Sequence, residues 1–341
     1  MSRSLPRLQQ TDPAVAPARL IALDWGTTNL RALLLDEAGK TLAQRSAPTG
    51  ILNIQQGQFE GALRALCADW LSDLSTVVMA SGMIGSRQGW VEAPYLQAPT
   101  TPAAAAAALT RVRLNDGGEL RLIPGIACVN GTHAEAVDDV MRGEETQVWG
   151  ADLPDGATVI LPGTHSKWVR CGPSGTILGC RTWMTGELFA VLSQHSILGK
   201  LMAPGEGSAP AFELGARRGL HAPESLSTLL FSVRTAGLMN RLEPHALADY
   251  LSGLLIGAEV AAGQQNGSLR SAPGDERPDS SASAAAKTSP CVHLVGEPAL
   301  CARYATVLTM AGEPSVTLDG ALAARGAWRI AKAAGLLEPG R

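Results

Sequence analysis

The chain of 341 residues begins the same local pattern twice. An apolar run at 20–24 is followed by a turn of small residues and a returning apolar run at 30–36. This order predicts a β-hairpin. The order restarts with an apolar run at 158–161, a turn, and a returning segment at 167–170. A fold built on two similar hairpins is therefore expected.

The two hairpins also keep a common register further along the chain. Gly26-Thr27 recurs 137 positions later as Gly163-Thr164, and Arg45–Gly50 recurs 136 positions later as Arg181–Gly186. Self-similarity at a fixed offset predicts two domains with one topology. Chance agreement among the 37 glycines of the chain is the alternative.

Apolar spacing predicts the elements around these hairpins. A strand at 77–80 runs into a glycine-punctuated loop at 81–90. Further helices are expected over 58–74, 103–108, 132–149, 299–311 and 320–335, and a further strand over 293–296.

The distribution of apolar residues indicates the domain organisation. Residues 267–290 are of low complexity and hold almost no apolar side chain, which is typical of a disordered surface insertion. We expect a flexible tail over 1–19, an N-terminal domain with a substrate loop over 20–155, and a C-terminal, nucleotide-side domain over 156–335 that contains the insertion.

Composition excludes several classes of function. The formal net charge is −3, so no basic excess favours nucleic acid or an anionic membrane as a partner. The six cysteines form no C-x-x-C pair, which favours reduced thiols over a zinc site or a disulfide framework. No apolar run approaches the roughly eighteen residues of a membrane span, and Met1–Arg19 lacks the apolar core of a signal peptide. A cytoplasmic protein is expected.

The turn of the first hairpin carries candidate phosphate-binding groups. Glycine and threonine at Gly26, Thr27 and Thr28 let backbone N–H groups approach an anion and add hydroxyl donors. Asp24, at the end of the preceding strand, could hold a hydrated Mg²⁺ beside phosphates. An ordinary hairpin with an Asx-type turn is the alternative.

The second hairpin has the same chemistry with an added lysine, in Gly163, Thr164, His165 and Lys167. Two such hairpins that face each other across a cleft suit phosphoryl transfer, which needs positioning, a cation and a base. Because Leu161 stands at the repeat position of Asp24, only the first hairpin would bring a metal ligand. His165 and Lys167 could instead be exposed hairpin residues.

Several motifs resemble those of the 2-dehydro-3-deoxygalactonokinases, of the actin-like ATPase and sugar-kinase superfamily, over about residues 20–335. The resemblance rests on 21–32, 81–95, 142–147, 161–169, 184–189 and 250–257. It implies ATP- and Mg²⁺-dependent phosphorylation of 2-dehydro-3-deoxy-D-galactonate at its 6-hydroxyl, in galactonate breakdown. It also implies an α/β fold of two actin-like (ribonuclease H-like) domains. Each would be a mixed five-stranded sheet with helices, and the nucleotide would lie in the interdomain cleft.

The resemblance also assigns roles to residues. Asp24, Gly26, Thr27 and Thr28 match the first phosphate motif, and Gly163, Thr164 and His165 match the second. Gly296 matches the adenosine motif, although Glu297 stands where a second glycine is common. Related kinases carry a carboxylate base shortly before the second hairpin; Glu144 is favoured here, with Asp138, Asp139 and Glu145 as alternatives.

The substrate that the resemblance implies is an acid, and arginine suits bidentate binding of a carboxylate. Arg87 lies in the glycine-bounded loop and is the candidate for this contact. The other candidate substrate-binding residues are Asn53, Trp90, Glu92, Tyr95 and Glu187.

Three alternative functions stay open at this point. The chain could phosphorylate a related sugar acid such as 2-dehydro-3-deoxygluconate. It could be a non-catalytic sugar- or nucleotide-binding regulator, or an ATPase that acts on a protein partner. The oligomeric state is not readable from the sequence, and a homodimer is one alternative.

Overall fold

The first half of the chain forms a sheet of six strands. The computed structural model describes residues 18–55, 57–131, 136–265, 291–318 and 320–338. The central strand β1 is buried at Leu20, Ile21 and Leu23, as expected of an apolar run covered on both faces. The strand order is β3 (Thr41–Ala47), β2 (Leu30–Asp36), β1 (Ala18–Trp25), β4 (Val77–Ser81), β7 (Glu119–Leu122) and β6 (Thr110–Arg113).

The second half repeats this topology in a sheet of five strands. In both sheets three antiparallel strands are followed by two parallel ones. The expected α/β architecture of two actin-like sheets is therefore confirmed. The order is β12 (Ile177–Trp183), β11 (Ser166–Cys171), β10 (Thr158–Leu161), β13 (Val292–Val295) and β14 (Ser315–Leu318).

The expectation of five strands in each sheet is wrong for the first sheet. There β6 adds a sixth strand, antiparallel to β7. A small third sheet, which the sequence did not indicate, consists of β5 (Tyr95–Gln97), β8 (Gly125–Asn130) and β9 (Val137–Met141).

The predicted helix over 132–149 is wrong in its first part. Residues 132–135 lie outside the described residues, β9 follows, and the helix α3 begins only at Glu144 and ends at Ala151. Strand β9 is held by a contact distant in sequence, because Asp139 accepts hydrogen bonds of 2.6 Å from the backbone N–H and the hydroxyl of Thr182. Gly143, with φ of +112°, then separates the strand from the helix.

The other predicted elements occur with shifted ends. The helix expected over 58–74 is α1 (Phe59–Cys67) followed by a 3₁₀ turn at Trp70–Ser72. The alanine run forms α2 (Pro102–Ala107), and the two C-terminal helices are α8 (Pro298–Met310) and α9 (Leu322–Ala333). The predicted tail over 1–19 falls almost entirely, and the insertion over 267–290 wholly, outside the described residues. The domain bounds stay a prediction.

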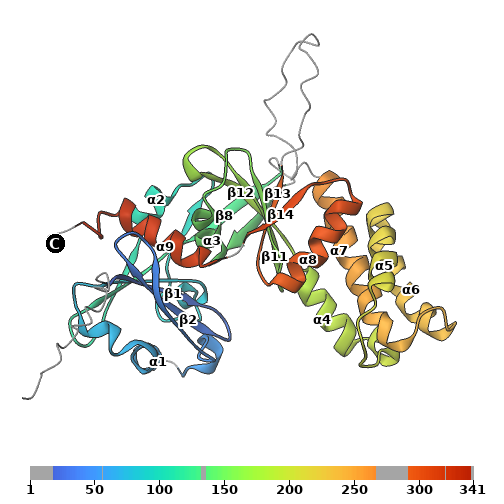
Figure 1. Cartoon of the computed structure of the whole chain (residues 1–341), viewed down its shortest axis with the longest axis horizontal. Coiled ribbons are helices and arrows are strands. Elements are labelled where there is room, and N and C mark those ends of the chain that lie inside the picture. Colours follow the sequence, from blue (N-terminus) through green and yellow to red (C-terminus); the bar gives the residue numbers. More distant parts are fainter. Residues whose placement is uncertain (1–17, 56, 132–135, 266–290, 319, 339–341) are drawn as a thin grey trace, which may run out of the picture.

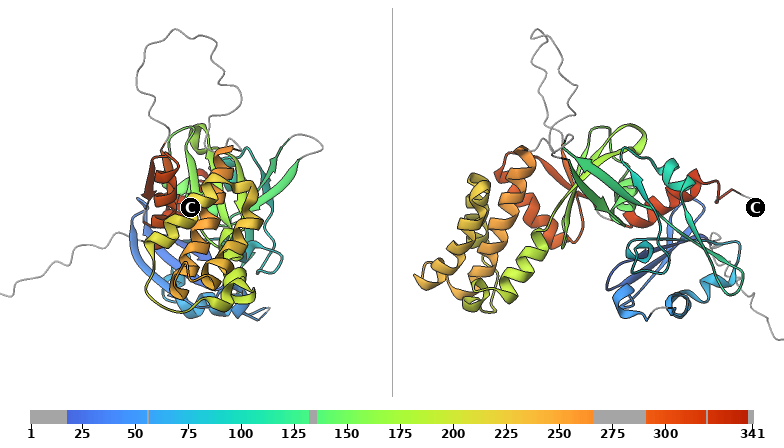
Figure 2. Two further views of the ribbon diagram at one scale, coloured as in Figure 1. Left: turned by 90° about the vertical axis from the view of Figure 1, so that its right-hand side faces the viewer. Right: turned by 180° about the vertical axis from the view of Figure 1, so that it is seen from behind.

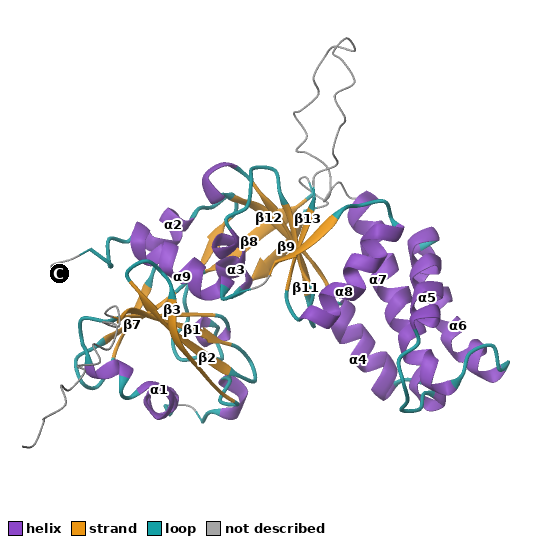
Figure 3. Cartoon of the chain, viewed as in Figure 1, coloured by secondary structure: helices purple, strands orange, loops and turns teal. Residues whose placement is uncertain are grey.

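A bundle of helices is inserted between β12 and β13. It lies at the opposite end of the molecule from the first sheet, with the second sheet between them (Figures 1 and 3), and the view from behind shows the same order (Figure 2). One segment, Pro244–Gln265, is long and apolar enough to cross a membrane, but 83% of its most apolar window is buried inside the protein. The bundle consists of α4 (Thr185–His195), α5 (Ala209–His221), α6 (Leu226–Leu238) and α7 (Leu247–Gln265).

Helices α3 and α9 cross at close range and join the two halves. Although α9 follows the second sheet in the chain, it packs against β1 and β4 of the first sheet. A Cβ atom at Gly150 would lie 1.9 Å from the carbonyl oxygen of Leu322, and one at Gly326 would lie 1.9 Å from that of Thr146. One continuous core includes both helices and the facing sides of both sheets.

Gly150→Ala is expected to lower the free energy of unfolding by about 1–3 kcal/mol, because the added methyl group overpacks the crossing. The loss should occur although alanine's higher helix propensity alone would stabilise the helix by up to ~1 kcal/mol. Urea unfolding measures the change. The matched control is Gly179→Ala on β12, where no atom lies within 4 Å of the added carbon. Equal stability of the two variants would contradict the packing argument.

Candidate functional site

A cleft between the two halves is lined by candidate phosphate-binding residues of both hairpins, although Gly26 and Thr28 of the first turn are not among the lining residues. Its cavity has a volume of about 930 Å³. Each hairpin contributes through its turn, the start of α3 contributes acidic and basic side chains, and the end of β13 closes one side. The lining includes Asp24, Thr27, Arg31, Arg142, Glu144, Gln147, Gly163, Thr164, His165, Gly296 and Glu297.

Backbone hydrogen bonds fix the turn of the first hairpin. The N–H of Gly26 donates to the carbonyl of Asn29 (3.0 Å), and the N–H of Gly50 donates to that of Thr28 (2.9 Å). A Cβ atom at Gly50 would lie 2.3 Å from the Thr28 backbone, so only glycine allows this approach. The amide of Asn53 donates to the carbonyl of Thr28 at 3.2 Å and supports the same turn. Asn53 does not line the cleft.

Asp24, the last residue but one of β1, lies at the edge of the cleft with one third of its side chain exposed. Partial burial raises the pKa of its carboxyl, and the guanidinium of Arg31, 4.0 Å away, opposes this rise. The carboxylate is therefore open to a ligand from the cleft.

The turn of the second hairpin packs on the start of α4. The N–H of Glu187 donates to the carbonyl of Thr164 at 2.9 Å, and the carboxylate of Glu187 lies 2.5 Å from Nε2 of His165. Lys167 instead turns inward, where its ammonium group donates to Val140 O (2.8 Å) and to the hydroxyl of Thr182 (2.7 Å). Gly163, Thr164 and His165 line the cleft, whereas Lys167 and Glu187 do not.

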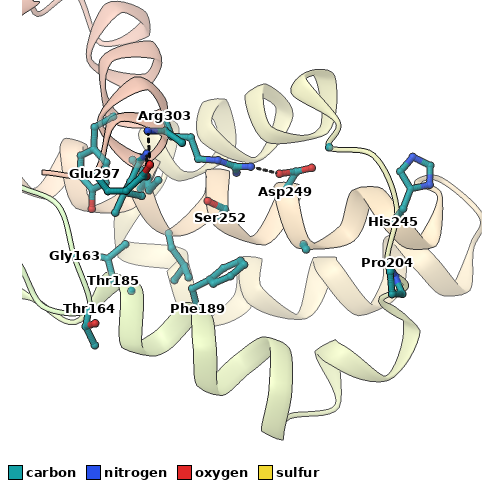
Figure 4. Close-up of a pocket in the computed structure, with 18 of the residues that line it drawn as sticks. Gly163, Thr164, Thr185, Phe189, Pro204, His245, Asp249, Ser252, Glu297 and Arg303 are labelled. Carbon is teal, nitrogen blue, oxygen red and sulfur yellow. Dashed lines mark hydrogen bonds and ion pairs between the residues drawn. The ribbon is translucent and has the colours of Figure 1, made fainter. Parts of the chain in front are cut away.

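A second cavity of about 700 Å³ opens between α4, α7 and α8 (Figure 4). It shares Gly163, Thr164 and Glu297 with the cleft. Glu297 caps α8 by accepting hydrogen bonds from the N–H groups of Ala299 (3.0 Å) and Leu300 (2.8 Å), and these bonds lower its pKa. The two cavities thus meet at Gly163 and Thr164 of the second hairpin and at Glu297, next to Gly296.

A buried carboxylate holds the walls of the second cavity together. Glu259 of α7 accepts hydrogen bonds from Ser166 (2.7 Å) and Trp168 (2.7 Å) on β11, and from Tyr304 on α8 (2.6 Å). The hydroxyl of Thr185 on α4 donates to it as well. One side chain therefore ties the hairpin strand to three helices.

The start of α3 places two carboxyl groups beside the cleft. Glu144 lines the cavity and accepts a hydrogen bond from the N–H of Arg142 at 3.0 Å, and burial raises its pKa. Glu145 is fully buried, and its two oxygens lie 2.9 and 2.7 Å from the N–H of Gly143. Burial, followed by the charge of Glu144, raises the pKa of Glu145 to about 8. Of the four candidate bases, Glu144 lines the cleft, while Asp138 and Asp139 lie on β9.

The predicted substrate loop lies beside the cleft, and its four candidate side chains lie outside the cleft lining. Arg87 is 88% exposed and forms an ion pair of 3.0 Å with Glu92. Trp90 stacks on Phe59, with ring centroids 6.0 Å apart, and packs half-buried against a second hydrophobic core on the other face of the first sheet. The ring of Tyr95 lies 4.1 Å from the guanidinium carbon of Arg142. None of Arg87, Trp90, Glu92 and Tyr95 lines the cavity.

The sequence reasoning missed Arg142 and Gln147 as cleft residues. Both belong to the segment 142–147, which carried part of the family resemblance without a role for these two side chains. An arginine directly before a glycine and two glutamates was the available signal. Its burial could not be read from the sequence.

Glu145→Gln is expected to change the pH dependence of stability. The folded pKa of about 8 lies above the ordinary value of ~4.3. Between these values the folded state keeps a proton that the unfolded state releases, so wild-type stability falls as pH rises. Glu145→Gln lacks this pH-dependent contribution. The unfolding temperature of the variant minus that of the wild type should therefore increase from pH 5 to pH 8. Thermal unfolding measures this difference, with the exposed Glu224→Gln as control. A difference that stays constant with pH would contradict the argument.

The chain is similar to one group of kinases in sequence and structure. A family model described as 2-keto-3-deoxy-galactonokinase matches residues 24–330. The 2-dehydro-3-deoxygalactonokinase of Escherichia coli K12 is 42% identical over 245 residues, which cover 72% of this chain and 80% of that protein. A Rhizobium meliloti protein provisionally given the same name is 37% identical over 247 residues, covering 70% and 78%. A crystal structure from Sinorhizobium meliloti, also provisionally assigned, has a TM-score of 0.77 at 32% identity, covering 94% and 99%.

Proposed function

The chain belongs to the 2-keto-3-deoxy-galactonokinase family, and from this premise we propose that it transfers the γ-phosphate of ATP to the 6-hydroxyl of 2-dehydro-3-deoxy-D-galactonate. One observation carries the proposal beyond the family. The two glycine–threonine hairpins contribute to a single cleft, and that cleft joins a second cavity at Gly163, Thr164 and Glu297. We further propose that the enzyme acts in the cytoplasm, where ATP is available.

The second cavity suits the adenosine part of ATP. Side chains of α4, α7 and α8 give it an apolar lining with a few polar groups, as is typical of sites for small molecules. A nucleotide bound there would direct its phosphates past Gly163 and Thr164 into the cleft. Backbone N–H groups and hydroxyls of the two turns would then bind the phosphate oxygens.

The residues of the cleft fit a magnesium ion held largely by the substrate. Among residues that the structure describes, no three His, Cys, Asp or Glu side chains gather as a metal site. Mg²⁺ commonly takes one or two carboxylates together with waters and phosphate oxygens, and Asp24 offers one such carboxylate. When bound, the ion would neutralise charge on the phosphates.

Glu144 is the proposed general base. In the transfer, the oxygen of the 6-hydroxyl attacks the γ-phosphorus, and the bond from that phosphorus to the β–γ bridging oxygen breaks. ADP leaves, and the hydroxyl proton passes to the carboxylate of Glu144. Burial raises the pKa of the Glu144 carboxyl, and a backbone hydrogen bond and the charge of Lys167 oppose this rise.

The test of the function is an ADP-release assay with Mg·ATP and a panel of sugar acids, with the product examined by NMR. We expect turnover on 2-dehydro-3-deoxygalactonate and phosphate on its 6-oxygen. Asp24→Asn should lower kcat by about 100-fold or more while the protein keeps its unfolding temperature, because it removes the charged metal ligand. A higher kcat/KM for 2-dehydro-3-deoxygluconate would identify that sugar acid as the substrate instead. If the protein binds the sugar acid without turnover, the result favours a non-catalytic regulator. If it hydrolyses ATP without any sugar-acid acceptor, the result favours an ATPase that acts on a protein partner.

The pH profile tests the base. Glu144 must be ionised to accept the proton, and burial raises its pKa above the ordinary value of ~4.3. Wild-type kcat/KM should therefore rise with pH to a plateau, with an apparent pKa above that value. Glu144→Gln should lose about 100- to 10,000-fold in kcat together with this acidic limb. Asp138→Asn, on β9, is the control and should keep both the wild-type kcat and the acidic limb of the pH profile. If Glu144→Gln kept the acidic limb, Glu144 would be excluded as the base.

A further inference from the structure

Arg142 presents an unusual buried cation at the edge of the cleft. The residue is 9% exposed and lies between β9 and α3. Its Nη2 donates to the carbonyl of Ala93 at 2.9 Å, and its Nε lies 3.3 Å from the hydroxyl of Tyr95. Nη1 is buried without a hydrogen-bond partner.

No carboxylate of the described residues forms an ion pair with Arg142. Glu144 accepts a hydrogen bond from its backbone N–H, at 3.0 Å, and not from its guanidinium group. The cleft's other arginine, Arg31, is 61% exposed and lies 4.0 Å from Asp24. A buried charge is costly unless it is paired, and arginine cannot release its proton to escape this cost. The fold thus keeps a buried cation that calls for an anion.

The residues around Arg142 hold its guanidinium group in one orientation. The ring of Tyr95 stacks on the guanidinium plane, and the carbonyl of Ala93 fixes one nitrogen. On the side of Nη1 stands Gly85, where a Cβ atom would come within 3.1 Å of that nitrogen. Glycine at this position lets the loop pack closely against this nitrogen, so the guanidinium group is held in one place at the wall of the cleft that Arg142 lines. A planar guanidinium held in this way is preorganised for a carboxylate.

We infer that Arg142 binds the carboxylate of the sugar-acid substrate. The inference rests on the proposed function and deepens it, because it names the group that distinguishes a sugar acid from a neutral sugar. The loop at 83–95 then acts on the substrate indirectly, through Ala93 and Tyr95 that hold Arg142. Arg87, the candidate from sequence, is the competing residue.

The test compares the sugar acid with its neutral C1 amide. Binding of each is measured by calorimetry without ATP, and turnover of each by ADP release. In the wild type the acid should bind more tightly than the amide. Arg142→Met should weaken binding of the acid and raise its KM by about 100-fold, leave the KM for ATP unchanged, and abolish the preference for the acid. Arg142→Lys keeps the positive charge but loses the two parallel N–H donors of the guanidinium group, so it should retain part of the preference for the acid.

Two further arginine variants make the result specific. Arg111→Met removes an exposed arginine of β6 that does not line the cleft. This variant should leave the KM for the sugar acid and the KM for ATP unchanged. If Arg87→Met, rather than Arg142→Met, loses the preference, or if Arg142→Met keeps it, the inference is overturned. Binding of the acid that depends on Arg142 without any turnover would support the inference and contradict the proposed kinase activity. A wild type that binds neither compound overturns both.

Discussion

The close crossing of α3 and α9 is the contact on which the geometry of the cleft depends. Two glycines, Gly150 and Gly326, let the backbones of the helices touch, and a larger residue at either position would meet a carbonyl oxygen. Both helices begin at the cleft, where Glu144 stands at the start of α3 and Leu322 at the start of α9. Because the same pair belongs to the core shared by both sheets, a change in the crossing would move Glu144, the proposed base, relative to the two proposed phosphate-binding turns. The packing of α3 against α9 therefore sets the positions of the cleft residues at the start of each helix.

The two halves share a topology and divide the chemistry between them. Asp24 lies near the end of β1, whereas the apolar Leu161 ends β10, so the carboxylate near the strand end in the first half has no counterpart at the repeat position in the second. The second half instead carries the inserted helices, which Glu259 fastens to β11 and α8 through buried hydrogen bonds. A repeated fold can host an asymmetric reaction in this way, because function resides in the sites placed on the fold.

The sequence predicted what depends on local pattern and missed what depends on distant contacts. The hairpin turns were foreseen because glycine and threonine between apolar runs specify them within a few residues. Strand β9 was taken for a helix because the bond from Thr182 to Asp139 joins segments that no local periodicity connects. Lys167 and Trp90 have the residue types of binding sites, yet the fold uses the first to tie β11 to β9 and the second to fill the core. Residue type thus indicates chemistry, whereas burial decides whether that chemistry faces a ligand or the scaffold.

The start of α3 gathers buried charged groups that lower the stability of the fold. Arg142 is a buried cation without an ion pair among the described side chains, and Glu144 and Glu145 are neighbouring acids whose pKa values burial raises. A scaffold selected for stability alone would replace all three by apolar side chains of similar volume. Local rules are broken in this way at functional sites, where the unfavourable term is offset when a ligand binds. An anionic substrate carboxylate at Arg142 would supply such an offset, and Glu144 stands on the same short segment to act on a hydroxyl of that substrate. The carboxylate receptor and the base would then be positioned by one glycine-hinged turn, so that recognition of the acid and activation of its hydroxyl share a single structural origin.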